Sequence, residues 1–128
     1  MQYAILCYHD ENVTCAWSKE EDDAVMAKLG VVMEKLTKQG KLGPVARLLP
    51  TTAATTLRKD REPPIVIDGP FAETKEQLLG FYIVDCASLE EALDITRELA
   101  AANPGGAYEI RPVGFFFEPP RSQSRAAS

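Results

Sequence analysis

The stretch "QLLGFYIVDCASLEEALDITREL", residues 77–99, decides the fold, because a long strand passes directly into a capped helix. Its first ten residues are apolar at both alternating sets of positions, which predicts a central strand covered on both faces. Ser88 and Glu91 have the spacing of a capping box, and apolar residues then recur at helical intervals until Asn103-Pro104-Gly105-Gly106. The sequence therefore predicts one complete strand–helix unit.

A second strand–helix unit opens the chain. Residues 3–8, "YAILCY", are also apolar on both faces, and Ser18 and Glu21 repeat the capping-box spacing before a helical pattern that ends at Gly40. Alternating and β-branched residues predict further strands, two of them as hairpin arms, at 43–50, 51–59, 63–68 and 107–113. This order predicts an α+β fold, a ferredoxin-like split βαβ sandwich with an antiparallel sheet.

The bare face of the sheet predicts self-association. Two helices cover only one face of the sheet, yet both long strands are apolar on both faces. A second subunit that packs sheet against sheet is the simplest way to bury the other face. We therefore expect a homodimer. The residues expected to be buried are Ile5, Leu29, Val32, Leu36, Ile83, Leu93 and Leu99.

Length and composition narrow the possibilities. The chain of 128 residues suits one domain, expected at 1–118, and residues 119–128 have too little apolar content to pack and are expected to form a disordered tail. A net charge of −5 without a dense basic cluster argues against direct binding of nucleic acid. No apolar run approaches the ~20 residues that span a bilayer, and no signal peptide opens the chain, so we expect a soluble cytoplasmic protein.

The three cysteines, Cys7, Cys15 and Cys86, have no paired spacing, which predicts reduced thiols rather than a disulfide framework or a thiolate metal site. A single histidine among scattered carboxylates likewise predicts no metal site. No phosphate loop, nucleophile elbow or dinucleotide fingerprint is present, so no cofactor is predicted.

The segment "DGPFAETKEQLLGFY", residues 68–82, resembles the signature of the YCII-related, DGPF-domain proteins, and the opening "YAILCYHDE" is similar to theirs. The resemblance extends to about Val113. It implies a dimeric α+β barrel with ferredoxin-like protomers, found mostly in bacteria, whose biochemical activity is generally unassigned. The family therefore implies a fold more directly than a reaction.

Two residues are candidates for catalysis. The turn Gly69-Pro70 displays the carboxylate of Asp68 at a strand end, although the same residues would also serve a plain Asx turn. His9, the only histidine, directly follows the first strand and could equally lie in a polar surface turn. In the wider YCII-related group a His and Asp pair is the proposed active site, so the resemblance implies an acid–base pair of His9 and Asp68.

Four further residues are candidates for substrate binding. Glu73 and Lys75 match the family pattern, but they could also belong to a solvated charge run that includes Glu76. Arg111, on the last strand, could bind a carboxylate or form an ion pair across the dimer. The fourth candidate is Phe71, which directly follows the turn.

Three functions stay open from the sequence. One is a small-molecule enzyme that uses His9 and Asp68 in a cavity near the dimer interface. Another is a non-catalytic metabolite-binding or regulatory module, which analogy links to sigma-factor-type transcription regulators. A purely structural dimer is the third. Contact between His9 and Asp68 within hydrogen-bond reach would favour the enzyme, and separation would favour the module.

Overall fold

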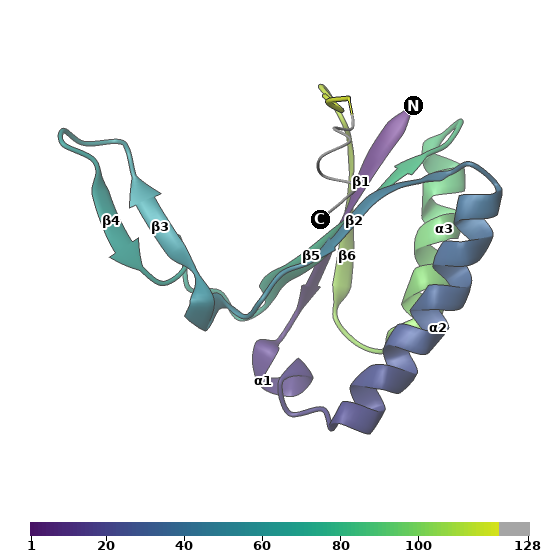
Figure 1. Ribbon diagram of the computed structural model, residues 1–128, viewed down its shortest axis with the longest axis horizontal. Helices are drawn as coiled ribbons and strands as arrows, with labels where there is room; N and C mark the ends of the chain where they lie inside the picture. The colour runs from purple at the N-terminus through teal and green to yellow at the C-terminus, as the bar shows by residue number, and fades with distance from the viewer. Residues whose placement is uncertain (121–128) are drawn as a thin grey trace.

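A four-stranded sheet forms the centre of the protein in a computed structural model that describes residues 1–120. Its strands are β1 (Gln2–His9), β2 (Leu42–Arg47), β5 (Gln77–Asp85) and β6 (Ala107–Pro112). Their order is β2-β5-β1-β6, and every neighbouring pair is antiparallel. Helices α2 (Lys19–Lys38) and α3 (Leu89–Ala102) lie together on one face of the sheet (Figure 1). This arrangement confirms the predicted α+β class and is consistent with the ferredoxin-like fold.

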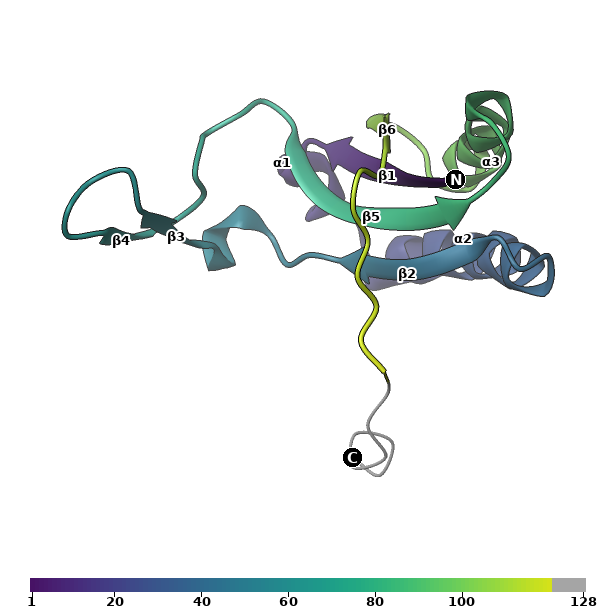
Figure 2. The same ribbon diagram turned by 90° about the horizontal axis from the view of Figure 1, so that it is seen from above.

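A two-stranded ribbon, which we call the arm, stands apart from this body. It consists of β3 (Thr55–Arg58) and β4 (Ile65–Asp68), which pair only with each other. Figures 1 and 2 show the arm projecting beyond the end of the sheet at which β2 ends and β5 begins. The hairpin strands predicted from the sequence are therefore present, but β3 and β4 form a separate sheet.

Two short elements border the arm and the end of β1. They are α1 (Glu11–Thr14) and the 3-10 turn η1 (Thr51–Ala53). The sequence did not predict α1, because one helical turn of mostly polar residues has no apolar periodicity to reveal it. Asp10 caps this turn by accepting a hydrogen bond from the backbone N–H of Asn12.

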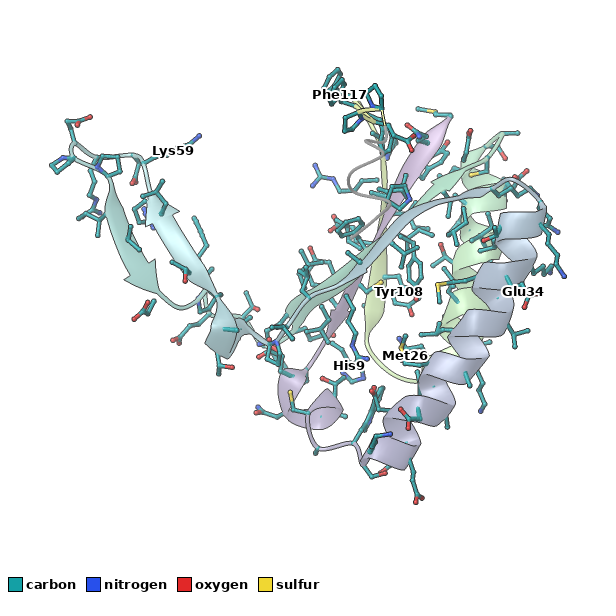
Figure 3. The ribbon with its side chains drawn as sticks, in the orientation of Figure 1. His9, Met26, Glu34, Lys59, Tyr108 and Phe117 are labelled. Carbon is teal, nitrogen blue, oxygen red and sulfur yellow. The ribbon has the colours of Figure 1, made fainter. Side chains whose placement is uncertain are left out.

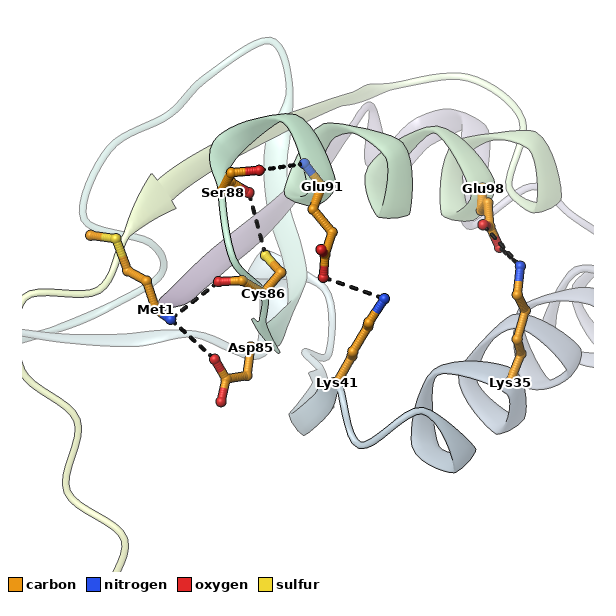
Figure 4. A network of polar contacts seen from close by, with 8 residues as sticks. All are labelled: Met1, Lys35, Lys41, Asp85, Cys86, Ser88, Glu91 and Glu98. Atoms are coloured by element: carbon orange, nitrogen blue, oxygen red, sulfur yellow. Dashed lines mark hydrogen bonds and ion pairs between the residues drawn. The ribbon is translucent and has the colours of Figure 1, made fainter.

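Both hydrogen bonds of the predicted capping box are present at α2, and one of the two is present at α3. At α2, the Ser18 side chain accepts from the Glu21 N–H, and the Glu21 carboxylate accepts from the Ser18 N–H. At α3, the Ser88 hydroxyl accepts from the backbone of Glu91. The Glu91 carboxylate instead pairs with Lys41 at 3.3 Å and so ties α3 to the segment before β2 (Figure 4).

Polar contacts also fix the first residue and the two helices. The Met1 ammonium donates to the Asp85 carboxylate at 3.2 Å and to the Cys86 carbonyl at 3.1 Å. Lys35 of α2 pairs with Glu98 of α3 at 3.1 Å (Figure 4). The start of β1 is therefore tied to the end of β5, and the two helices are joined side by side.

The core lies between the sheet and the two helices. Its most completely buried side chains are Ile5, Val84, Leu36 and Leu99, each less than 2% exposed. Of the residues predicted to be buried, Ile5, Leu29, Leu36 and Leu99 are confirmed, whereas Val32, Ile83 and Leu93 are only half-buried. On α3, Ile95 and Thr96 lie in the core instead of Leu93.

The half-burial of Ile83 follows from strand geometry. Tyr82 and Val84 face the helices, so Ile83 between them faces the opposite side of the sheet. Ala4, Leu6 and Phe81 share that uncovered face and are also half-buried. The uncovered apolar face expected from the sequence is therefore present, and what covers it stays a prediction.

The end of the chain adds exposed aromatic surface. Phe115 and Phe117 are 85% and 71% exposed in the segment after β6. Pro119 and Pro120 have no regular secondary structure, and residues 121–128 of the expected tail lie outside the described residues. None of the described helices combines the length and the apolar character that crossing a membrane requires.

Candidate functional site

A cavity of about 570 Å³ lies between the sheet and α2, at the end where β1 runs into α1. Sheet residues form one wall and α2 residues the other. Figure 3 shows His9, Met26 and Tyr108 in the space between these two walls. The volume falls in the range of ordinary small-molecule sites, roughly 300–1,000 Å³. The lining residues used below are Cys7, His9, Trp17, Asp22, Met26, Arg47, Tyr82, Asn103 and Tyr108.

The cavity exists because α2 is longer than α3. α2 has 20 residues and α3 has 14, and α2 continues past the end of α3 (Figure 1). The first half of α2 therefore faces the sheet without a helical neighbour to fill the space. Met26, in that half, is 39% exposed, whereas Leu36, beside α3, is 1% exposed.

His9 lies at the mouth of the cavity with a defined orientation. Its Nδ1 accepts a hydrogen bond of 2.8 Å from the Asp10 N–H, which places the proton of the neutral ring on Nε2. The ring meets Trp17 edge to face, with centroids 6.1 Å apart. The backbone thus selects one tautomer of the imidazole.

Two glycines hold the other side of the imidazole. Gly105 and Gly106 have positive φ angles of 80° and 77°, and a Cβ atom at Gly105 would lie 2.6 Å from His9 Nε2. The sequence identified these glycines only as the stop of a helix. Their second role depends on a contact between distant segments, which no local pattern reveals.

An ion pair and a carboxylate network frame the mouth. Arg47 of β2 binds Asp22 of α2 through two hydrogen bonds of 2.8 and 3.3 Å, and this hydrogen bonding holds the pKa of Asp22 below its usual value. The Glu11 carboxylate accepts from the Thr51 N–H at 2.7 Å and from its hydroxyl at 2.8 Å. Sequence reasoning singled out none of these residues.

The inner end of the cavity carries neutral polar groups. Burial raises the pKa values of the Tyr82 and Tyr108 hydroxyls and raises that of the Cys7 thiol to about 12. The Asn103 side-chain amide donates to the Tyr108 hydroxyl at 3.1 Å. At neutral pH these side chains are therefore uncharged, and both tyrosine hydroxyls keep their protons.

Asp68 lies outside this cavity. It ends β4 opposite Thr55, and the Gly69 N–H donates to the Ala54 carbonyl at 2.8 Å to close the base of the arm. Gly69 has φ of 114°, which explains why glycine is needed in this turn. No hydrogen bond or ion pair within residues 1–120 joins Asp68 to His9, so the single chain does not bring the predicted pair together.

The other predicted site residues also lie outside the cavity lining. Phe71 is 66% exposed, and the Arg58 guanidinium lies 5.2 Å from its ring centroid. Glu73 and Lys75 are exposed in the segment between the arm and β5, and Arg111 is exposed on β6. Of the six candidates, the structure brings only His9 to the cavity, and the roles of the other five stay predictions.

Comparison with known proteins identifies the family. The model of the YCII-related domain matches residues 1–116. This chain belongs to the YCII-related family. Uncharacterized protein R00369 of Rhizobium meliloti (strain 1021) is a relative with 64% identity over 117 residues, covering 91% of this chain and 94% of that protein. The resemblance found in the sequence is thus confirmed.

The polar groups on the cavity wall of this YCII-related protein can form hydrogen bonds and exchange protons. In the part of the chain that the structure describes, no three His, Cys, Asp or Glu side chains are grouped closely enough to hold a metal ion. The cavity instead offers one oriented imidazole, two neutral phenols and a primary amide, set in largely apolar walls. Such walls favour binding of a molecule that is itself mostly apolar.

Proposed function

We propose that this YCII-related protein binds a small, mostly apolar molecule in the cavity between the sheet and α2. The observation that carries the proposal is the cavity itself, with its 570 Å³ of space and His9 at its mouth. A void left by poor packing would leave loose side chains nearby, yet Ile5 and Val84 of the adjoining strands are fully buried. The space is therefore a local feature beside a well-packed core.

The uncovered sheet face supports the homodimer expected from the sequence. Leu6, Phe81 and Ile83 lie on that face, and an open sheet with an apolar face needs a cover in water. The arm and the uncovered face form the two sides of a V in Figure 1, with the helices outside it. We propose that a second copy of the chain lies in this V and completes a dimeric α+β barrel.

Acid–base catalysis by His9 is the second candidate function. Its support is the fixed Nδ1, which makes Nε2, on the side of the ring that faces Gly105, the nitrogen that would exchange a proton. Within one chain Asp68 is on the arm, so partnership with His9 requires the arm of a second copy. Because the chain by itself separates the two residues, binding without chemistry is the function that the geometry supports better.

Blocking the cavity tests the proposed binding. Nile red, a neutral apolar dye, should bind the full chain saturably, with a rise in fluorescence. Met26→Trp places an indole in the cavity and should weaken this binding at least tenfold. Val31→Trp adds the same ring at a position of α2 that is 70% exposed, and it should leave the affinity unchanged.

Two results would contradict the proposal. One is the absence of saturable dye binding by the parent protein. The other is equal affinity of the parent and Met26→Trp when circular dichroism shows both to be folded, since the dye would then occupy another apolar surface.

A further inference from the structure

The inner end of the cavity holds polar groups whose hydrogen-bonding capacity is unused. Tyr82 is only 6% exposed and lines the cavity, and among residues 1–120 its hydroxyl has no hydrogen-bond partner. Among the described residues, the fully buried side-chain polar atoms without a partner do not include the Tyr82 hydroxyl, so this hydroxyl is open to the cavity. The position of Tyr82 on the cavity wall gives its hydroxyl access to a bound molecule.

Tyr108 and Asn103 extend this polar surface. The Tyr108 hydroxyl accepts from Asn103 Nδ2 at 3.1 Å, which leaves the Tyr108 proton free to donate. Asn103 Oδ1 is a fully buried acceptor without a partner in the described chain. The surface therefore offers two hydroxyl donors, of which Tyr108 is oriented by Asn103.

These groups come from strands on either side of β1. Tyr82 is on β5, opposite Ile5 of β1, and Tyr108 is on β6, opposite Cys7 of β1. The side chains of Tyr82, Tyr108 and Cys7 line the cavity wall that faces α2. Regular strands thus fix the positions of both phenols, which favours a defined binding geometry.

The charge of this surface limits what it can bind. Burial keeps both tyrosines and the Cys7 thiol protonated, and the lysine and arginine on the cavity wall, Lys19 and Arg47, are already paired with Asp23 and Asp22. A carboxylate or phosphate would lose its hydration here without gaining a counter-charge. A neutral oxygen can accept a hydrogen bond from each of the two phenols, and it has no charge whose hydration would be lost on binding.

We propose that Tyr82 and Tyr108 bind the neutral carbonyl group of a ligand whose remaining body is aromatic or alicyclic. The carbonyl oxygen accepts from the two phenols, and Asn103 Nδ2 positions Tyr108 by donating to its hydroxyl oxygen. The apolar body lies along Met26 and the other α2 residues of the cavity wall. This inference rests on the proposed function, since it names the chemical class of molecule for the same cavity.

A matched pair of probes tests the carbonyl directly. 2-Acetylnaphthalene and 2-ethylnaphthalene have the same ring and nearly the same size, but only the first has a carbonyl oxygen. We expect the ketone to bind the full chain at least tenfold more tightly than the hydrocarbon, measured by titration of protein NMR shifts. 2-Naphthoate, which is anionic, should bind more weakly than the ketone.

Variants that remove single hydroxyls localise the effect. Tyr82→Phe should lower the affinity for the ketone about tenfold and leave that for the hydrocarbon unchanged, and Tyr108→Phe should act in the same direction. Tyr3→Phe is the matched control, because Tyr3 is also 6% exposed on the helix side of the sheet but does not line the cavity.

The outcomes separate this inference from the proposed function. Equal affinity for the ketone and the hydrocarbon, unaltered by Tyr82→Phe, overturns the carbonyl site while the cavity still binds. Tighter binding of the naphthoate overturns the neutral character of the ligand. Binding of none of the three probes counts against both proposals.

Discussion

The body and the arm are built from similar apolar residues but bury them very differently. In the body, Ile5, Val84 and Leu99 are less than 2% exposed. In the arm, Leu57 and Val66 are 58% and 67% exposed, although both belong to paired strands. The difference shows that an apolar pattern predicts an element without stating what will cover it.

The arm also differs from the body in how it can be stable. Leu57 and Val66 face one side of the ribbon, while Ile65 and Ile67 face the other, so both sides carry apolar surface. An isolated two-stranded hairpin is at best marginally stable in water. We therefore expect the body to fold by its own packing and the arm to depend on the second copy proposed above.

The largest expected effect comes from a buried residue of the body. Leu36→Ala should lower the free energy of unfolding by about 2–5 kcal/mol, because Leu36 is 1% exposed and its loss leaves a cavity. Val31→Ala, on the same helix at 70% exposure, is the control and should change stability little. Urea unfolding of both variants measures the difference, and equal losses would contradict the description of this core.

A charge in the arm should affect association rather than folding. Val66→Asp should raise the dissociation constant of the dimer at least tenfold, because a carboxylate would have to be desolvated at the interface. Val31→Asp places the same charge at a similarly exposed valine of the body and should leave the constant unchanged. Sedimentation equilibrium measures both, and a monomeric parent at micromolar concentration would refute the dimer.

The smallest expected effect separates two ion pairs. Arg47 lowers the pKa of Asp22 and joins β2 to α2, whereas Arg58 lowers the pKa of Asp60 within the tip of the arm. Because Asp22 is one-third exposed, Asp22→Asn should cost at most about 1 kcal/mol at pH 7. Asp60→Asn should leave the unfolding of the body unchanged.

The pH dependence of the Asp22 effect has a definite sign. A carboxyl with a lowered native pKa stabilises the fold above its unfolded pKa, about 3.9, and loses that contribution as pH falls through the native value. The difference between parent and Asp22→Asn should therefore shrink as pH falls below about 3.9. A difference that did not change with pH would mean that asparagine disturbs packing rather than charge.

The strands and helices of the body could be predicted because their signals are local. The spacing of Ser18 and Glu21 predicts the start of α2 from four residues. The run that is apolar on both faces predicts β5 in the same local way. The partner of the Glu91 carboxylate could not be predicted, because the carboxylate binds Lys41 from a different part of the chain. Long-range ion pairs depend on the finished fold.

The candidate site was predicted much less completely than the fold. His9 could be singled out because it is the only histidine and ends a strand, and it does reach the cavity. Tyr82 was predicted to be an apolar strand residue that ends the family signature, and Asn103 was predicted only as part of a helix stop. Their shared position arises from the unequal reach of the helices, which no spacing in the sequence encodes.

The contact between His9 and the two glycines after α3 has a consequence for how this family can diverge. Position 106 is constrained by the backbone carbonyl of Tyr8 as well as by the imidazole, so it should stay glycine whatever residue occupies position 9. At position 105 the three nearest atoms that a Cβ atom would meet all belong to the His9 ring. A lineage that replaced His9 with a smaller side chain could therefore accept asparagine, which tolerates the left-handed conformation, at Gly105. Positions 9 and 105 should consequently co-vary among relatives, while position 106 stays fixed.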